Sequence, residues 1–345
     1  MNTFADVIKT AYDHKYSDIH LKGGLGIYHR KGGRILRNVD LDIPPDKIEE
    51  VIQTTLDDRC RRSLAKHRKI DYSLQVLPEI RARGNAFYQR KALCGIYRII
   101  PTKVPSIKDT GLPPILRDFA LRPRGLVIVA GPAGSGKTTT AAAMINEINI
   151  SVRRHIVTIE DPVEFIFVDD KSVITQREIG TNSLSFQMGL KGSLRQDPDV
   201  VFIGEMRDLE TVSTAITMAE TGHLVISTIQ TIGACEVIDR IVNMFPPQQQ
   251  EQIRTQLSLN TQGIVSQMLL PKGENANEMV AAIEILNPTF ALRALIRKGE
   301  VVKIKGALET SVRDHCMPGK MAVEELFKKK LINEATKAMA LDYMK

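Results

Sequence analysis

A complete phosphate-loop pattern, G-x-x-x-x-G-K-[ST], lies at residues 131–138, which read GPAGSGKT. An apolar, strand-sized run at 126–130 precedes it, and a run of helix-forming residues begins at Lys137. In this context the glycines let backbone N–H groups surround a polyphosphate, the lysine reaches the β and γ phosphates, and the Thr138 hydroxyl is a ligand for Mg²⁺. The sequence therefore predicts an ATP and Mg²⁺ site. Its nucleotide-binding residues are Gly131, Pro132, Ala133, Gly134, Ser135, Gly136, Lys137, Thr138 and Thr139.

Phosphoryl transfer to water also requires a carboxylate that orients the attacking water. A second apolar run, 200–204, is followed at once by Glu205, at the Walker B position. We expect Glu205 to be this base, because catalytic groups gather on loops at strand ends. The structural alternative is an ordinary acidic residue at a helix N-terminus.

A third apolar run, 155–159, leads into Glu160, Asp161 and Glu164. Three carboxylates so close together repel one another unless a cation or hydrogen-bond donors lie nearby. Glu160 is therefore predicted to act around Mg²⁺, which gives a metal set of Thr138, Glu160 and Glu205. A solvated acidic turn is the alternative.

The order of the elements predicts two domains. A mixture of helices (4–12 and 45–64) and strand-like segments (19–21, 26–28, 71–76 and 82–100) indicates a small α+β domain over 1–100, and a proline-rich stretch indicates a linker over 101–115. From 116 to 345, apolar strands alternate with helices, which predicts a parallel sheet with the ligand at its carboxyl edge. The region after Pro246 is expected to be mostly helical. The fold class is α/β.

Composition narrows the partners. The first 105 residues carry 20 Lys and Arg against 12 Asp and Glu, whereas the remainder is nearly neutral with 27 against 28. The basic run from Arg59 to Lys69 has no aromatic interleaving, so a solvated helix face is favoured over nucleic-acid binding. Apolar runs are too short to span a bilayer, and the beginning of the chain lacks a leader pattern, so a cytoplasmic protein without an integral membrane segment is expected.

Two further groups stand out. His223 opens the apolar run 224–229, where a histidine is more often structural than catalytic. Arg81, Arg83 and Arg98 lie in strand-like segments of the first domain, and Arg81 and Arg83 share a strand face because they are two residues apart. Arginines supplied by another subunit accelerate such reactions by about 10³- to 10⁵-fold.

With these segments in hand, the chain resembles the PilT family of secretion ATPases, the hexameric motors that retract type IV pili. The resemblance spans nearly the whole length. It rests on SDIHL (17–21), RARGNAF (81–87), YRIIP (97–101), the phosphate-loop region (123–140), HIVTIEDPVEF (155–165), ITQREIG (174–180), LRQDPDVVFIGEMRDLET (194–211), AETGHL (219–224), IDRIVNMFPP (238–247) and ALRALIRK (291–298).

The resemblance implies a PAS-like domain joined to a RecA-like ATPase domain. It implies that Glu160 is the Asp-box acid, Glu205 the Walker B glutamate and His223 a catalytic His-box residue, and that Arg83 and Arg98, with Arg81 close by, reach the nucleotide. It also implies a cytoplasmic homohexamer at the inner face of the inner membrane. Its partners there would be a pilus platform protein and a sister pilus ATPase, with no nucleic acid.

The chain departs from the family pattern at three places. Gln230 replaces the second His-box histidine, and glutamine donates hydrogen bonds but cannot become cationic. Ala133 stands in the loop where threonine is usual, and Ala294 and Lys298 alter the C-terminal signature. The leading hypothesis is a retraction ATPase. The alternatives are an accessory ATP-binding subunit with weak hydrolysis, an assembly or secretion ATPase of the same superfamily, and a nucleic-acid-driven ATPase.

Overall fold

The computed structural model describes residues 3–31, 34–37, 43–101, 104–273 and 275–344. These residues form two units. One contains the described residues up to 101 together with 162–166, and the other contains 104–161 and 167–344. Residues 102 and 103 of the linker predicted over 101–115 lie outside the described residues.

The N-terminal unit is a six-stranded antiparallel sheet with three helices, in the strand order β3-β2-β1-β6-β5-β4. Its strands are β1 (Asp18–Lys22), β2 (Gly26–Lys31), β3 (Arg34–Arg37), β4 (Lys69–Leu77), β5 (Ile80–Gln89) and β6 (Ala92–Pro101). Its helices are α1 (Phe4–Asp13), α2 (Ile48–Thr54) and α3 (Asp58–His67). This is the predicted α+β unit, and its specific PAS-like character stays a prediction.

Two predicted segments of this unit are each divided in the structure. The helix predicted over 45–64 is two helices, because Asp57 caps the start of α3 by accepting the Cys60 N–H at 2.6 Å. The strand-like segment 82–100 is a hairpin of β5 and β6, which turns at Arg90 with φ 56°.

The C-terminal unit is built on a seven-stranded sheet in the order β13-β12-β7-β11-β10-β8-β9. Its strands are β7 (Gly125–Ala130), β8 (His155–Glu160), β9 (Val173–Glu178), β10 (Val200–Ile203), β11 (Leu224–Ile229), β12 (Thr261–Lys272) and β13 (Asn275–Leu286). Every pairing is parallel except that of β12 with β13.

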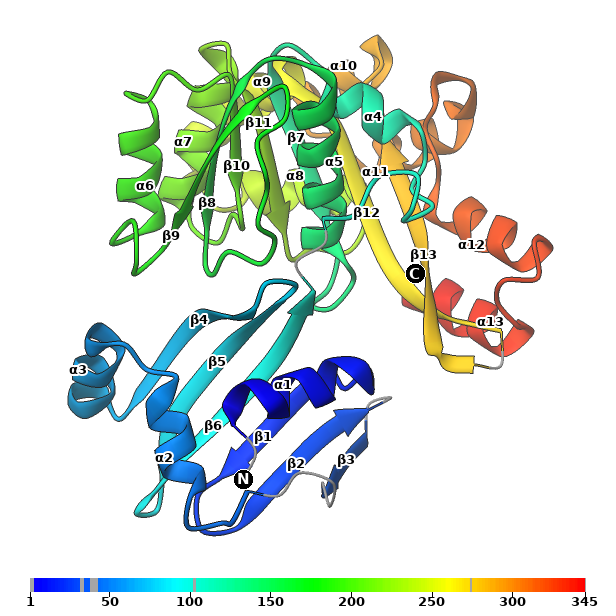
Figure 1. Ribbon diagram of the computed structural model, residues 1–345. Helices are drawn as coiled ribbons and strands as arrows, with labels where there is room; N and C mark the ends of the chain where they lie inside the picture. Colours follow the sequence, from blue (N-terminus) through cyan, green and yellow to red (C-terminus); the bar gives the residue numbers. More distant parts are fainter. Residues whose placement is uncertain (1–2, 32–33, 38–42, 102–103, 274, 345) are drawn as a thin grey trace. The chain divides into compact units, whose positions relative to one another are not determined.

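Helices cover both faces of this sheet (Figure 1). They are α4 (Ile115–Ala120), α5 (Lys137–Ser151), α6 (Phe186–Ser193), α7 (Leu209–Glu220), α8 (Ala234–Val242), α9 (Pro247–Asn260), α10 (Phe290–Lys298), α11 (Val301–Thr310), α12 (Gly319–Lys328) and α13 (Glu334–Tyr343), with a 3₁₀ turn at Val312–Asp314. Strand β7 shows why two faces are covered. Leu126 and Ile128 pack with α7 and α8, whereas Val127 and Val129 pack with α4 and α5. A continuous apolar strand is thus buried on both sides.

The expectation that the region after Pro246 is mostly helical is wrong for 261–286. These residues form a long antiparallel hairpin, β12–β13, that extends the sheet beside β7. Apolar runs of this length fit either a strand or a helix. The strand forms here because β12 pairs with the edge of β7 that β11 leaves unpaired. Strands β3 and β9 were also not predicted. The predicted α/β class with a parallel-sheet phosphate-loop domain is confirmed.

Candidate nucleotide site

The phosphate loop leaves the carboxyl end of β7 and returns into α5. Gly131, Gly134 and Gly136 have φ values of 148°, 76° and 86°, which side chains rarely tolerate. Gly136 is the N-cap of α5, so the first-turn N–H groups of the helix face the loop. Lys137 Nζ folds back to donate to the Pro132 carbonyl at 2.8 Å. The loop therefore carries the first-turn donors of α5 and the Lys137 ammonium in one short segment, which is the arrangement that phosphate binding requires.

The predicted acids lie at the same edge of the sheet, because parallel strands end together. Glu160 ends β8 and Glu205 follows β10, and the two strands are neighbours. The Gly204 N–H donates to the Ile159 carbonyl at 2.8 Å. A Cβ at Gly204 would lie 3.3 Å from the Cα of Glu160, so the glycine permits this close approach of the two backbones.

Glu205 makes an ion pair with Arg207. The Arg207 Nε lies 2.6 Å from Glu205 Oε2, and another nitrogen of the same guanidinium lies 3.8 Å from Asp161 Oδ2. The Glu205 side chain is only 14% exposed, whereas that of Arg207 is 54% exposed. The carboxylate is thus held in a largely dry position, whereas its arginine partner reaches solvent.

Glu160 is buried at 4% exposure. Its Oε1 accepts hydrogen bonds from Thr158 Oγ1 at 2.7 Å and Gln176 Nε2 at 3.3 Å. A buried carboxylate requires such partners, and these two fix the direction in which it points. The alternative of a solvated acidic turn is therefore wrong for Glu160.

The predicted metal set fits Mg²⁺ by its chemistry. Thr138 contributes a hydroxyl, and Glu160 and Glu205 contribute carboxylates, which are the hard oxygen ligands that Mg²⁺ takes together with phosphate and water. Magnesium coordination by these residues stays a prediction.

His223 is not brought to the loop. It precedes β11, and Leu224 at the start of this strand pairs with Gly125 at the start of β7. The loop begins one strand length away, about 20 Å for six residues. His223 Nδ1 instead contacts the Met218 carbonyl at 3.0 Å, in the turn that follows α7. The structure therefore does not place His223 beside the loop of its own chain, and its catalytic role stays a prediction.

Gln230 has the opposite placement. It follows the last residue of β11, Ile229, whose carbonyl accepts the Gly131 N–H at 3.3 Å. Gln230 is exposed at the carboxyl edge beside the loop. Of the two His-box positions, the one that carries glutamine in this chain is the one at the nucleotide edge.

The three arginines form one group in the N-terminal unit. Arg83 and Arg98 are directly opposite each other on β5 and β6, and Arg81 lies two residues along β5. Arg98 Nε donates to Asp18 Oδ1 at 2.9 Å, and Arg81 donates to Ser73 Oγ at 3.0 Å. Like charges directly opposite each other on a sheet are destabilising, and the ion pair of Arg98 with Asp18 offsets part of this charge.

One residue at the site was missed by the sequence analysis. Gln267 on β12 is buried at 4% exposure and contacts the loop and the first turn of α5 through its side-chain amide. The available signal was a polar pair, Ser266 and Gln267, inside the otherwise apolar run 263–270. It would have been informative only if that run had been predicted as a strand beside β7.

A phosphate loop after a central strand, with carboxylates at the ends of neighbouring parallel strands, defines the class of RecA-like P-loop nucleotide-binding proteins. The pattern of the family described as Type II/IV secretion system protein matches residues 107–341. The chain belongs to this family and is a PilT-like secretion ATPase. Its loop is accordingly a nucleotide-binding site.

Individual relatives agree over most of their lengths. The chain is 38% identical over 315 residues to the type IV pilus retractation ATPase PilT of Pseudomonas aeruginosa, which covers 89% of this chain and 90% of that protein. It is 39% identical over 298 residues to a twitching motility protein of Neisseria gonorrhoeae, covering 86% of this chain and 79% of the relative.

A solved structure gives the same result. The crystal structure of the pilus retraction motor PilT with bound ADP superposes with a TM-score of 0.91 and 39% identity, over 99% of this chain and 97% of the other. Within the described part of this chain, no helix has the length and apolar character needed to cross a membrane.

Proposed function

We propose that the chain hydrolyses ATP at the loop formed by Gly131–Thr139 and that the reaction powers retraction of a type IV pilus. The observation that carries this proposal is the placement of Glu205 at the carboxyl edge that also carries the complete phosphate loop. The likeness to PilT over nearly the whole chain supports retraction, rather than assembly, of the pilus.

Each residue has a role that its position permits. Backbone N–H groups of the loop and Lys137 hold the phosphates, and Glu205 orients the attacking water once Arg207 swings away from it. Thr138, Glu160 and Glu205 would hold Mg²⁺, which neutralises developing phosphate charge when bound. Arg83 and Arg98, with Arg81, would supply positive charge to a nucleotide.

The proposal includes an assembly. The chain would act as a homohexamer in the cytoplasm, peripheral to the inner face of the inner membrane, with a pilus platform protein as partner. A sister pilus ATPase is a further partner, and no nucleic acid is required. The domain assignment proposed for this motor is 1–100, a linker at 101–115, and 116–345.

A second candidate function follows from Gln230. An imidazole at the nucleotide edge can become cationic, and an amide cannot. The chain would then be an accessory ATP-binding subunit that hydrolyses slowly and works with an active sister motor.

Steady-state ATPase rates of wild type, Glu205→Gln and Gln230→His, recorded with oligomeric state, test both candidates. For a motor, wild type turns over as a hexamer and Glu205→Gln lowers kcat by about 10²- to 10⁴-fold, because the carboxylate that orients the water is lost, while ADP binding persists, because the phosphate loop is unchanged. Glu210→Gln, on the exposed first turn of α7, is the matched control and should leave kcat unchanged. A silent wild type that Gln230→His activates would favour the accessory subunit.

A further inference from the structure

The strand beside β7 runs on past the point where the phosphate loop begins. Ser266 of β12 pairs with Ala130, the last residue of β7. Strand β12 continues to Lys272, so its next residue, Gln267, lies under the start of the loop. Strand β12 has 12 residues and β7 has six, so the second half of β12 extends beyond β7 and lies against the phosphate loop.

The Gln267 side chain makes one hydrogen bond to the phosphate loop and one to the first turn of α5. Its Nε2 donates to the Ser135 carbonyl at 2.5 Å, and its Oε1 accepts from Thr140 Oγ1 at 2.7 Å. Ser135 precedes the Gly136-Lys137-Thr138 segment and Thr140 lies in the first turn of the helix beyond it. Gln267, Ser135 and Thr140 are each no more than 4% exposed, so water does not compete for either bond.

The backbone of the same residue also contacts the loop. A Cβ at Gly131 would overlap the Gln267 carbonyl oxygen, and one at Gly136 would lie 3.0 Å from Gln267 Nε2. Both glycines thus pack directly on Gln267. The two hydrogen bonds run in opposite directions, so the site demands one donor and one acceptor in a planar group. Glutamate would place an oxygen against the Ser135 carbonyl, and an apolar side chain would leave both groups unpaired.

We infer that Gln267 is a positioning residue that holds the phosphate loop in its nucleotide-binding shape through Ser135 and Thr140. The inference rests on the proposed function, because it concerns the same loop. Phosphate binding requires the loop's N–H groups to converge, and a loop fixed in advance loses less conformational entropy when the nucleotide binds. In this role Gln267 affects the affinity for nucleotide. It does not contact the attacking water or the acids Glu160 and Glu205 at the ends of β8 and β10.

Isosteric variants test this role. Gln267→Met removes both hydrogen bonds, and Thr140→Val removes one. We expect the Kd for a fluorescent ADP and the KM for ATP to rise about 10- to 100-fold in the first and about 2- to 10-fold in the second. Thr140→Ser keeps the hydroxyl and should restore wild-type values. Adding Thr140→Val to Gln267→Met should raise Kd by less than twofold, because the bond is already lost.

The readout separates positioning from folding. A residue needed only for folding would reduce the fraction of active protein and so lower kcat at an unchanged KM, and that result would overturn the inference. Gln262→Met, the same change on β12 near the opposite edge of the sheet, is the matched control and should leave KM unchanged. Equal rises in KM for both glutamine variants, or fully additive effects in the double variant, would also overturn it.

Separate measurements of ADP binding and ATP turnover distinguish failure of the proposed function from failure of the inference about Gln267. If wild type binds ADP but does not hydrolyse ATP, the proposed motor fails while the effect of Gln267→Met on Kd still supports the inference. If wild type hydrolyses ATP and Gln267→Met binds ADP as tightly as wild type, the inference alone fails.

Discussion

Gly131 and Gly134 lie in the same loop, but the structure allows them different freedom. Gly131 has a φ of 148° and no room for a side chain, since a Cβ would overlap Gln267 and Ser135. Gly134 has a φ of 76°, and a Cβ there would meet nothing within 4 Å. The first glycine is required by packing and by backbone conformation, and the second only by backbone conformation.

Alanine at these two positions should therefore have unequal effects. Gly131→Ala should weaken ADP binding by about 3 kcal/mol, on the order of 100-fold in Kd, because the loop must shift away from β12. Gly134→Ala should cost about 1 kcal/mol, or about fivefold, from left-handed backbone strain alone. Calorimetric titration of ADP would measure both, and equal losses would contradict the packing argument.

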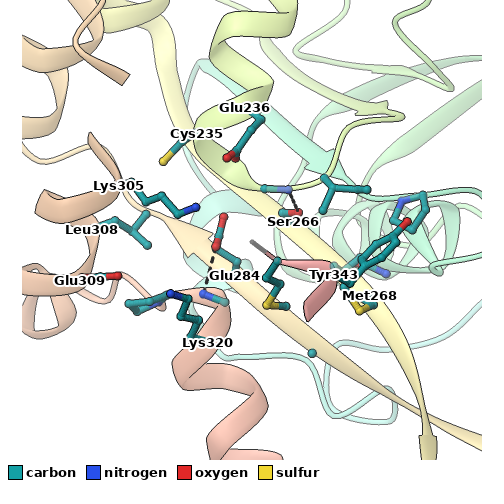
Figure 2. A pocket seen from close by; sticks show the side chains of 18 residues that line it. Cys235, Glu236, Ser266, Met268, Glu284, Lys305, Leu308, Glu309, Lys320 and Tyr343 are labelled. Atoms are coloured by element: carbon teal, nitrogen blue, oxygen red, sulfur yellow. Dashed lines mark hydrogen bonds between the residues drawn. The ribbon is translucent and has the colours of Figure 1, made fainter. Parts of the chain in front are cut away.

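At the scale of elements, the β12–β13 hairpin connects the loop region to the C-terminal helices. Glu284 on β13 accepts the first backbone N–H groups of two helices, Ala234 of α8 at 2.5 Å and Gly319 of α12 at 3.0 Å. Its carboxylate lines a cavity of about 240 Å³ together with Lys305 and Lys320. Figure 2 shows these three side chains. Burial raises the pKa of Glu284, and the two N–H bonds only partly oppose this.

Replacing this carboxylate should loosen both helix starts. Glu284→Gln can satisfy only one of the two N–H groups, so we expect a loss of about 1–3 kcal/mol in the free energy of unfolding. Glu278→Gln, on the same strand with an exposed side chain, should change stability by less than about 0.5 kcal/mol. Urea unfolding of both variants provides the comparison.

The raised pKa also fixes the sign of a pH effect. A carboxyl group with a higher pKa in the folded state favours folding when protonated, so its contribution is fully present below about 4.5, the ordinary value, and is lost as pH rises through the raised pKa. The stability difference between wild type and Glu284→Gln should therefore shrink as pH increases over this range. A difference that grows with pH would contradict the shift.

At the scale of the whole molecule, the chain has separate cores. One cluster of buried side chains lies entirely in the N-terminal unit, and includes Ile8, Ile19 and Tyr97. Two further clusters lie on the two faces of the seven-stranded sheet. Units with their own cores open as separate cooperative units.

Scanning calorimetry should show two unfolding transitions. ADP with Mg²⁺ at 100 times its Kd should stabilise the unit that contains the phosphate loop by about 2.7 kcal/mol. If Arg83 and Arg98 reach nucleotide in the assembled protein, the nucleotide also raises the unfolding temperature of the N-terminal unit. The Arg83→Ala/Arg98→Ala variant should then lose this increase and keep the increase of the unit that contains the phosphate loop. An unchanged N-terminal transition in wild type would contradict the proposed role of these arginines.

Particular residues show how far the sequence predicts the site. Local pattern alone predicts Lys137, Thr138, Glu160 and Glu205, because a phosphate loop and an acid after an apolar strand are each encoded within about ten residues. Gln267 lies 132 residues from Ser135, and no local pattern joins them. His223 was assigned by resemblance, and the direction of β11 places it at the opposite edge.

The sequence by itself determined that the chain binds a nucleotide, that parallel strands alternate with helices in its second domain, and which acids end those strands. These features depend on short-range spacing and on glycine's backbone freedom. The tertiary structure alone decided the strand order, and with it the position of β12 beside β7 and of Gln267 under the loop. The physical reason is that strand pairing is a choice among distant partners, made by burial on both faces of the sheet rather than by any one segment.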